Sequence, residues 1–340
     1  MGSAAAAVDC RTTGVAFCEE SVSPAGKTPA GGYGRVGREA VRCNALTIDV
    51  EDWFQLAYQK LCGQDVPASG RVVDNTRWLL EVLAEYNVRA TFFVLGMVAR
   101  QHPMLVREIA SAGHEVATHG FAHRCIHAQT QEAFEADLRR SIWLLEDIVQ
   151  QPVWGHRAAE FSVGTKTPWV FEALVAAGLR YDSSLFPIRH PRYGVPHAPR
   201  LPHIISTPQG PLVEFPPATM RLFRQNIPVA GGGYLRFFPP ALIRAGIRQL
   251  NRQGQIAVLY VHPYEFDEEW LDLPVPAASL SRRMYLRWRA WKRNWRRGHP
   301  MRIRFRQLLR EFPFVPLREV LDEYGTGEDT AVFSTPCSPV

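Results

Sequence analysis

The stretch ALTIDVEDWF (45–54) joins an apolar run to three acidic residues, and this junction decides the fold that we expect. ALTIDV (45–50) has the length and composition of a buried strand. Charged groups that follow a buried strand are costly to desolvate unless positive partners meet them. One acid could cap the next segment, but three acids indicate a site at the carboxyl end of the strand.

Outward from this strand, apolar runs alternate with amphipathic segments along the chain. Strands are expected at 89–96, 114–120, 153–158, 179–186 and 255–266, and helices at 72–87, about 98–112, 130–150, 168–178 and 240–253. Such alternation implies parallel strands joined by crossover helices, hence a barrel or a doubly wound sheet. No phosphate-binding glycine motif follows a strand, and GGGYL (231–235) is typical of a turn or a close backbone approach, which disfavours nucleotide chemistry.

The length of 340 residues suits one large α/β domain with an appendage. We expect a disordered arm at 1–42, a catalytic domain at 43–270, a basic helical extension at 271–325 and a tail at 326–340. The arm has no secretory signal pattern, and no stretch reaches the roughly 18 apolar residues of a membrane span. The six cysteines lie without paired spacing, which fits a reducing compartment. A cytoplasmic protein is therefore expected.

The segment EVATHGFAHRCIH (115–127) carries three histidines four residues apart, directly after a predicted strand. On one helical turn, two residues four apart share a face and can hold one ion. Two histidines and one carboxylate form a ligand set that leaves positions open for metal catalysis. The segment therefore predicts a metal site, provided that a carboxylate elsewhere in the chain reaches it.

The missing carboxylate is expected from the acids after the first strand. Strand alternation puts Asp49 and Glu51 on one face, and Asp52 lies just past the strand end. Either Glu51 or Asp52 is expected to bind the metal, and the sequence leaves this choice open. Asp49 is then free to act as a base.

With these residues in place, the chain resembles the polysaccharide deacetylases of the NodB-homology superfamily, most closely the subgroup encoded with exosortase-associated (PEP-CTERM) exopolysaccharide loci. The resemblance covers roughly residues 43–320. It rests on five motifs in the family's order, TIDVEDWF (47–54), THGFAH (118–123), GHRAAEFS (155–162), YDSSLFP (181–187) and VLYVHPYEF (258–266). It implies a distorted (β/α) barrel of the NodB type, a divalent metal for which zinc is expected, and hydrolysis of N-acetyl groups on amino sugars.

The resemblance also implies roles for single residues. Asp49 would be the catalytic base and His262 the catalytic acid, while Arg157 would pair with the base. Asp182 would lie at the wall of the active site. The chain departs from the wider family where Asp-Val-Glu-Asp replaces an adjacent Asp-Asp pair, and at Ala159, where proline is frequent.

The other implied roles concern metal and substrate. His119 and His123 would bind the metal together with Glu51 or Asp52, whereas His127 matches no family position and is expected to be a loop residue. Within the motifs, the residues expected to bind substrate are Trp53, Phe161 and Tyr264.

The basic charge is concentrated near the C-terminus. Residues 281–310 contain 12 of the 39 Lys/Arg and no Asp/Glu, so the remaining chain has 39 − 12 = 27 basic against 33 acidic residues. Within 281–306, Trp288, Trp291 and Trp295 are interleaved with arginines and would share one stripe of a helix with Met284.

Three interpretations of this basic segment remain. The helix could pack its tryptophan stripe on the barrel while the arginines face water. It could instead lie on an anionic membrane surface, which would make the protein peripheral on the inner face of the membrane. Arginine with aromatic residues can also hold single-stranded nucleic acid, but no nucleic-acid motif accompanies it, and that partner is not expected.

The function expected first is metal-dependent N-deacetylation of a polysaccharide or lipid-linked oligosaccharide in exopolysaccharide biosynthesis. One alternative is a hydrolase of a cyclic amide or ureide on the same fold. Another is a catalytically silent glycan-binding or membrane-scaffold protein. A silent homologue would usually lack an acid or a histidine of the expected set, and none is missing here.

Overall fold

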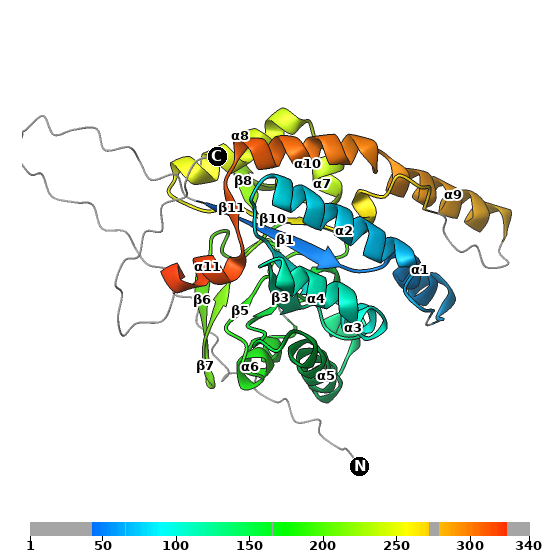
Figure 1. The fold of residues 1–340 in the computed structure, drawn as a ribbon. Helices are drawn as coiled ribbons and strands as arrows, with labels where there is room; N and C mark the ends of the chain where they lie inside the picture. The colour runs from blue at the N-terminus through cyan, green and yellow to red at the C-terminus, as the bar shows by residue number, and fades with distance from the viewer. Residues whose placement is uncertain (1–42, 65, 165, 272–278, 325–340) are drawn as a thin grey trace, which may run out of the picture.

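The structure, a computed structural model, describes residues 43–64, 66–164, 166–271 and 279–324 (Figure 1). The predicted arm (1–42) and tail (326–340) lie outside these residues. Within the described part of the chain, no helix has the length and apolar character needed to span a membrane.

Three of the six cysteines lie in the described residues. Cys43 is disulfide-bonded, whereas Cys62 and Cys125 are free thiols. The reducing compartment that we expected from the cysteine pattern stays a prediction.

A curled, mostly parallel sheet organises the chain. In the described residues it has nine strands, in the order β10-β1-β2-β3-β4-β5-β7-β6, with β11 paired to the start of β1. Their bounds are β1 Asn44–Val50, β2 Thr91–Val94, β3 Glu115–Thr118, β4 Gly155–His156, β5 Tyr181–Asp182, β6 His203–Thr207, β7 Gly210–Glu214, β10 Val258–Val261 and β11 Phe314–Val315. Only β6 and β7 pair antiparallel. The predicted α/β fold with parallel strands is confirmed.

Irregular segments around the hairpin of β8 (Thr219–Leu222) and β9 (Gln225–Pro228) help to close the sheet into a distorted barrel. The Ala218 N–H donates to the Val258 carbonyl at 3.0 Å, and the Tyr260 N–H donates to the Ala230 carbonyl at 2.9 Å. A Cβ on Gly231 would overlap the carbonyl of Tyr260. The glycine run therefore serves a close backbone approach, as predicted.

Helices cover the outside of the curled sheet (Figure 1). Their bounds are α1 Trp53–Cys62, α2 Gly70–Glu85, α3 Gly96–Gln101, α4 Pro103–Ser111, α5 Gln131–Val149, α6 Trp169–Ala176, α7 Gly233–Phe237, α8 Pro240–Arg252, α9 Leu280–Asn294, α10 His299–Glu311 and α11 Leu317–Leu321. The helix predicted at about 98–112 is two helices, because Pro103 disfavours helical geometry at His102.

The C-terminal part of the chain is built into the barrel. The basic segment forms two helices, which separate at Gly298, where φ is +64°. The second, α10, runs beside α2, where Arg306 bonds to Glu85, and it buries Phe305 in the main core (Figure 1). β11 then adds to the sheet beside β1.

Truncating Phe305, which is 1% exposed, should therefore destabilise the whole barrel. We expect Phe305→Ala to lower the free energy of unfolding by about 3–5 kcal/mol, measured by urea titration. Ile303→Ala is the matched control on the same helix, because Ile303 is 46% exposed and should cost less than about 1 kcal/mol. Equal effects of the two substitutions would contradict the integration of α10 into the core.

Candidate active site

Polar side chains from neighbouring parallel strands meet at the carboxyl edge of the sheet. Asp49 lies near the end of β1, His119 directly after β3, Arg157 directly after β4 and His262 directly after β10. Carboxyl ends of adjacent parallel strands lie at one edge, which is where such folds gather their chemistry. The structure thus brings together four of the residues that the sequence singled out.

Glu51, His119 and His123 form a cluster whose ligand atoms lie within 4.8 Å of one another. The Nε2 atom of His123 is 2.8 Å from Oε2 of Glu51, and that of His119 is 3.5 Å from the same oxygen. The Nδ1 atom of His119 contacts the carbonyl of Arg157 at 2.8 Å, which leaves Nε2 for the cluster. Two imidazole nitrogens and a carboxylate oxygen that converge in this way suit a divalent ion such as zinc.

The ionisation of Glu51 agrees with this arrangement. Burial alone would raise the pKa of the carboxyl, but the charge of His123, hydrogen bonds from both histidines and the charge of His262 hold the pKa of Glu51 well below its usual range. The carboxylate is therefore ionised at neutral pH, as a metal ligand must be.

The two histidines do not share a helical turn, as their spacing suggested. The segment after β3 is a loop, in which Gly120 and His123 have φ values of +74° and +52°. The carboxylate of Asp137 accepts hydrogen bonds from the N–H groups of Phe121 and Ala122 at 2.7 and 3.2 Å and so fixes the loop. Left-handed backbone, rather than helical periodicity, turns His123 back toward Glu51.

Asp52 does not belong to this cluster, and its carboxylate accepts hydrogen bonds from backbone N–H groups instead. It is the N-cap of α1, where its Oδ1 accepts from the Gln55 N–H at 2.7 Å. Its Oδ2 accepts from the N–H of Ser69 at 3.0 Å and from the Ser69 hydroxyl. Since both oxygens already have partners, the geometry favours Glu51 as the carboxylate of the cluster.

Asp49 is paired with Arg157 inside the barrel. Nη1 of Arg157 donates to Oδ1 of Asp49 at 2.7 Å and to the hydroxyl of Thr47 at 2.7 Å. Ser183 accepts from the same guanidinium through its carbonyl at 3.0 Å and its hydroxyl at 2.7 Å. The ion pair is almost fully buried and well satisfied, so it holds the base in one orientation. The sequence did not identify Thr47 or Ser183, although Thr47 shares the strand face of Asp49.

His262 lies opposite this pair. Its Nε2 is 3.8 Å from Oδ2 of Asp49 and 3.5 Å from Oε1 of Glu51, while its Nδ1 is 3.3 Å from Oε2 of Glu265. Burial lowers the pKa of His262, but the hydrogen bond to Glu265 and the nearby carboxylates outweigh it and raise the pKa above its usual value. The sequence missed Glu265, although an acid three residues after His262 is the spacing of a cap.

Asp182 lies deep in the protein, with its side chain wholly buried. Its Oδ1 accepts from the Ser184 hydroxyl at 2.7 Å and contacts Nδ1 of His156 at 2.8 Å. Beside it, Oε1 of Glu214 accepts the N–H groups of Ser184 and Leu185 at 3.1 and 2.9 Å. These contacts join the carboxyl ends of β4, β5 and β7, and the predicted place of Asp182 at the wall of the site stays a prediction.

The three predicted substrate-binding aromatics fall into two groups. Trp53 and Tyr264 lie 5.8 Å apart, and Tyr264 stacks on His262 at 4.8 Å. Phe161 instead packs 5.0 Å from Tyr260, inside the core. Arg293 of α9 lies over the rings of Trp53 and Tyr264 at 3.9 and 4.7 Å. No local sequence signal connects Arg293 with these motifs, because it comes from the basic segment.

Two family models match this chain. The model described as polysaccharide deacetylase matches residues 61–181, and a domain of unknown function matches residues 183–322. The fold is that of a crystal structure from Mycobacterium smegmatis assigned to the polysaccharide deacetylases. That structure has a TM-score of 0.55 and 22% identity, and the match covers 90% of this chain and 99% of that one.

Curated relatives point to the same family. A chitooligosaccharide deacetylase of Rhizobium leguminosarum is 46% identical over 66 residues, 19% of this chain and 31% of the relative. A peptidoglycan deacetylase of Helicobacter pylori is 33% identical over 109 residues, 32% of this chain and 36% of the relative. The chain thus spans about a third of the length of these relatives. Part of the chain is thus similar in sequence to polysaccharide deacetylases, whereas the exosortase-associated subgroup stays a prediction.

The Glu214–Asp182 contact generates a prediction about pH. Burial and the charge of Asp182 raise the pKa of Glu214 well above its usual range. The stability linked to this proton is complete below about pH 4, where Glu is protonated in the unfolded chain too, and is lost as pH rises through the folded pKa. The contribution of Glu214 to the unfolding free energy should therefore fall with rising pH, by up to about 1.4 kcal/mol per unit.

Glu214→Gln should flatten this dependence, because the amide donates to Asp182 without a titrating proton while its oxygen still accepts the two backbone N–H groups. Thermal unfolding at a series of pH values measures the slope. Parallel slopes for the two proteins would contradict a shared proton.

Proposed function

We propose that this protein is a metal-dependent deacetylase that hydrolyses N-acetyl groups on amino sugars. One observation carries the proposal. Two histidines and a carboxylate converge next to an Arg-oriented aspartate and a Glu-supported histidine, at the carboxyl edge of a curled parallel sheet. Amide hydrolysis needs such a set, because water must lose a proton and the amine must gain one.

In this proposal Glu51, His119 and His123 hold a divalent ion, for which we favour zinc. When bound, such an ion polarises the acetyl carbonyl and lowers the pKa of water. Asp49 accepts the proton of water at Oδ2, since Oδ1 is held by Arg157. His262 gives a proton to the departing amine from Nε2, while Glu265 holds its Nδ1.

The substrate is proposed to be an N-acetylated polysaccharide or a lipid-linked oligosaccharide, in exopolysaccharide biosynthesis. The relatives named as deacetylases of chitooligosaccharide and peptidoglycan support the class of substrate. Trp53 and Tyr264 offer ring faces beside His262, which suits contact with a sugar. We also propose that the enzyme meets this substrate at a membrane surface, because its basic helix α9 adjoins the site through Arg293.

The roles of the two adjacent acids can be separated by metal content. Glu51→Gln should lose bound zinc after dialysis, because the cluster then lacks its carboxylate. Asp52→Asn should keep the zinc but lose about 1 kcal/mol or more of unfolding free energy, since an amide cannot accept from all the donors that now reach Asp52. Elemental analysis and urea unfolding measure the two effects. The reverse pattern would assign the metal to Asp52.

The base can be tested with the metal in place. Asp49→Asn should retain zinc and the fold, yet release acetate from N-acetylglucosamine oligomers at least about 100-fold more slowly. The wild-type protein stripped with a chelator is the control and should be inactive until zinc is restored. Full activity of the stripped protein would exclude a metal-dependent reaction, and turnover of cyclic ureides in place of acetylated oligomers would support the alternative hydrolase.

A further inference from the structure

A stripe of large apolar side chains on α9 faces away from the protein. Leu280, Met284, Trp288 and Trp291 are 75%, 64%, 54% and 51% exposed, and Trp295 directly after the helix is 39% exposed. Their spacing of three or four residues puts them on one side of the helix. The buried side is opposite and carries Leu286 and Ala290. The interpretation in which the tryptophans pack on the barrel is therefore wrong.

Basic residues flank the stripe. Arg283, Arg287 and Lys292 are exposed, and no acidic residue lies between 280 and 298. On the helical wheel, Arg283 and Arg287 fall on one side of the stripe, and Lys292 falls on the other with Arg289. An apolar band between two cationic margins is the pattern of a helix that lies in a membrane interface.

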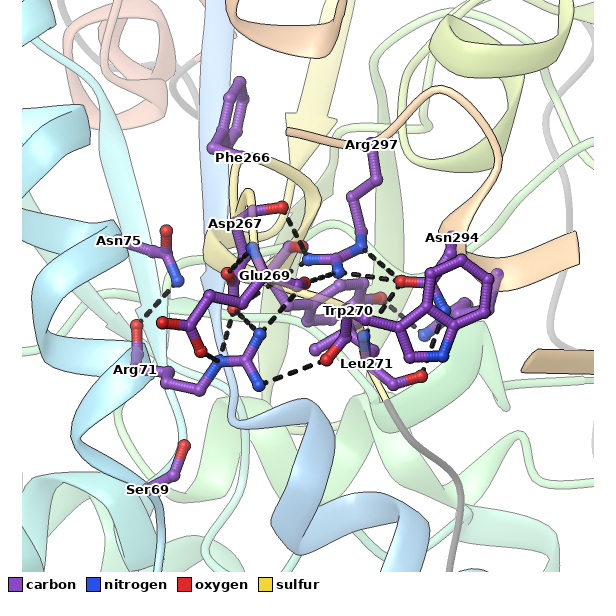
Figure 2. A network of polar contacts seen from close by, with 12 residues as sticks. Ser69, Arg71, Asn75, Phe266, Asp267, Glu269, Trp270, Leu271, Asn294 and Arg297 are labelled. Carbon is purple, nitrogen blue, oxygen red and sulfur yellow. Dashed lines mark hydrogen bonds and ion pairs between the residues drawn. The ribbon is translucent and has the colours of Figure 1, made fainter. Parts of the chain in front are cut away.

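One end of the helix is held firmly by a polar network that includes Asn294 and Arg297 (Figure 2). Asn294 exchanges hydrogen bonds with the backbone of Leu271 at 2.9 and 3.0 Å. Arg297 is buried and donates to the carbonyls of Tyr264 and Asp267 at 2.9 and 2.7 Å, and burial lowers its pKa to about 10. The C-terminal end of α9 is thus fixed to the segment that follows β10, while Figure 1 shows the helix extending beyond the barrel.

The same helix reaches the candidate active site. Arg293 donates to the hydroxyl of Tyr264 at 2.8 Å and lies over Trp53, and Tyr264 stacks on His262. The bare side of α9 and the side chains that surround the proposed acid therefore lie on opposite sides of the same helix. A surface bound by the stripe would lie next to the entrance for substrate.

We propose that α9 docks on an anionic phospholipid bilayer, with its tryptophan stripe in the interface and its basic margins on the headgroups. The surface fits this partner better than nucleic acid, because the exposed apolar residues form one continuous stripe along the helix and include Leu280 and Met284, which offer no ring for base stacking. The docking itself is independent of the reaction. Its consequence, that a lipid-linked glycan is presented to the site, rests on the proposed function.

The test is sedimentation of the full chain with phosphatidylglycerol/phosphatidylcholine vesicles. Trp288→Ser/Trp291→Ser should weaken binding at least 10-fold, while Trp143→Ser, a control on α5 whose tryptophan is 69% exposed, should change it less than 2-fold. Arg287→Glu/Lys292→Glu should release the protein at low salt, whereas Arg252→Glu/Lys166→Glu should not, because these exposed residues lie elsewhere on the surface. Arg293 and Arg297 are left unchanged because they contact the site and the interior.

The outcomes separate the two proposals. Wild-type binding to the anionic vesicles that resists all four α9 substitutions, or no binding at all, would overturn the docking surface. Tight binding of single-stranded nucleic acid without vesicle binding would also overturn it. Acetate release from a short soluble oligomer should stay within 2-fold of wild type in every variant, which shows that the fold is intact. Vesicle binding by a protein without deacetylase activity would leave the docking surface standing and reject the proposed function.

Discussion

The buried ion pair of Asp49 and Arg157 is the interaction on which the site depends. A guanidinium inside a barrel is tolerated only when its donors are satisfied, and Thr47, Asp49 and Ser183 together provide this. Thr47 and Asp49 belong to β1, and Ser183 follows β5. Arg157, which follows β4, therefore joins these two strands. The backbone carbonyl of the same arginine contacts Nδ1 of His119. One residue therefore orients both the proposed base and a proposed metal ligand.

A second set of polar contacts connects the site with the end of α9. Arg236 bonds to Glu265 at 3.0 Å, and Glu265 holds His262. Arg236 also donates to the carbonyls of Arg293 and Trp295 at 2.7 and 3.2 Å. Arg236 therefore supports both the proposed acid, through Glu265, and the C-terminal end of α9. A displacement of α9 would therefore also displace Arg236 and Glu265 and change the position of His262. The proposed chemistry is in this way connected to the surface of the molecule.

The fold and most of the site could be predicted from sequence because parallel strands place their carboxyl ends together, and the polar residues follow the apolar runs. Three features could not. The choice between Glu51 and Asp52 depends on Ser69, which meets Asp52 only in the folded chain. The turn at His123 depends on left-handed backbone, which the four-residue spacing does not encode. The direction of the tryptophan stripe depends on which side of α9 is packed, and periodicity locates an apolar side without showing whether the protein covers it.

Charge distribution gives the docking of α9 a direction. The segment 281–310 carries 12 positive charges, while the rest of the chain has 27 basic and 33 acidic residues and so a net charge of −6. An anionic surface therefore attracts the end of the molecule that bears this segment and repels the remainder, which orients the approach before any contact is made. Tryptophan insertion then holds that orientation, because the stripe is on a single side of a fixed helix. Since Arg293 joins that helix to Trp53 and Tyr264, an oriented approach places the mouth of the site at the surface from which a lipid-linked glycan would come.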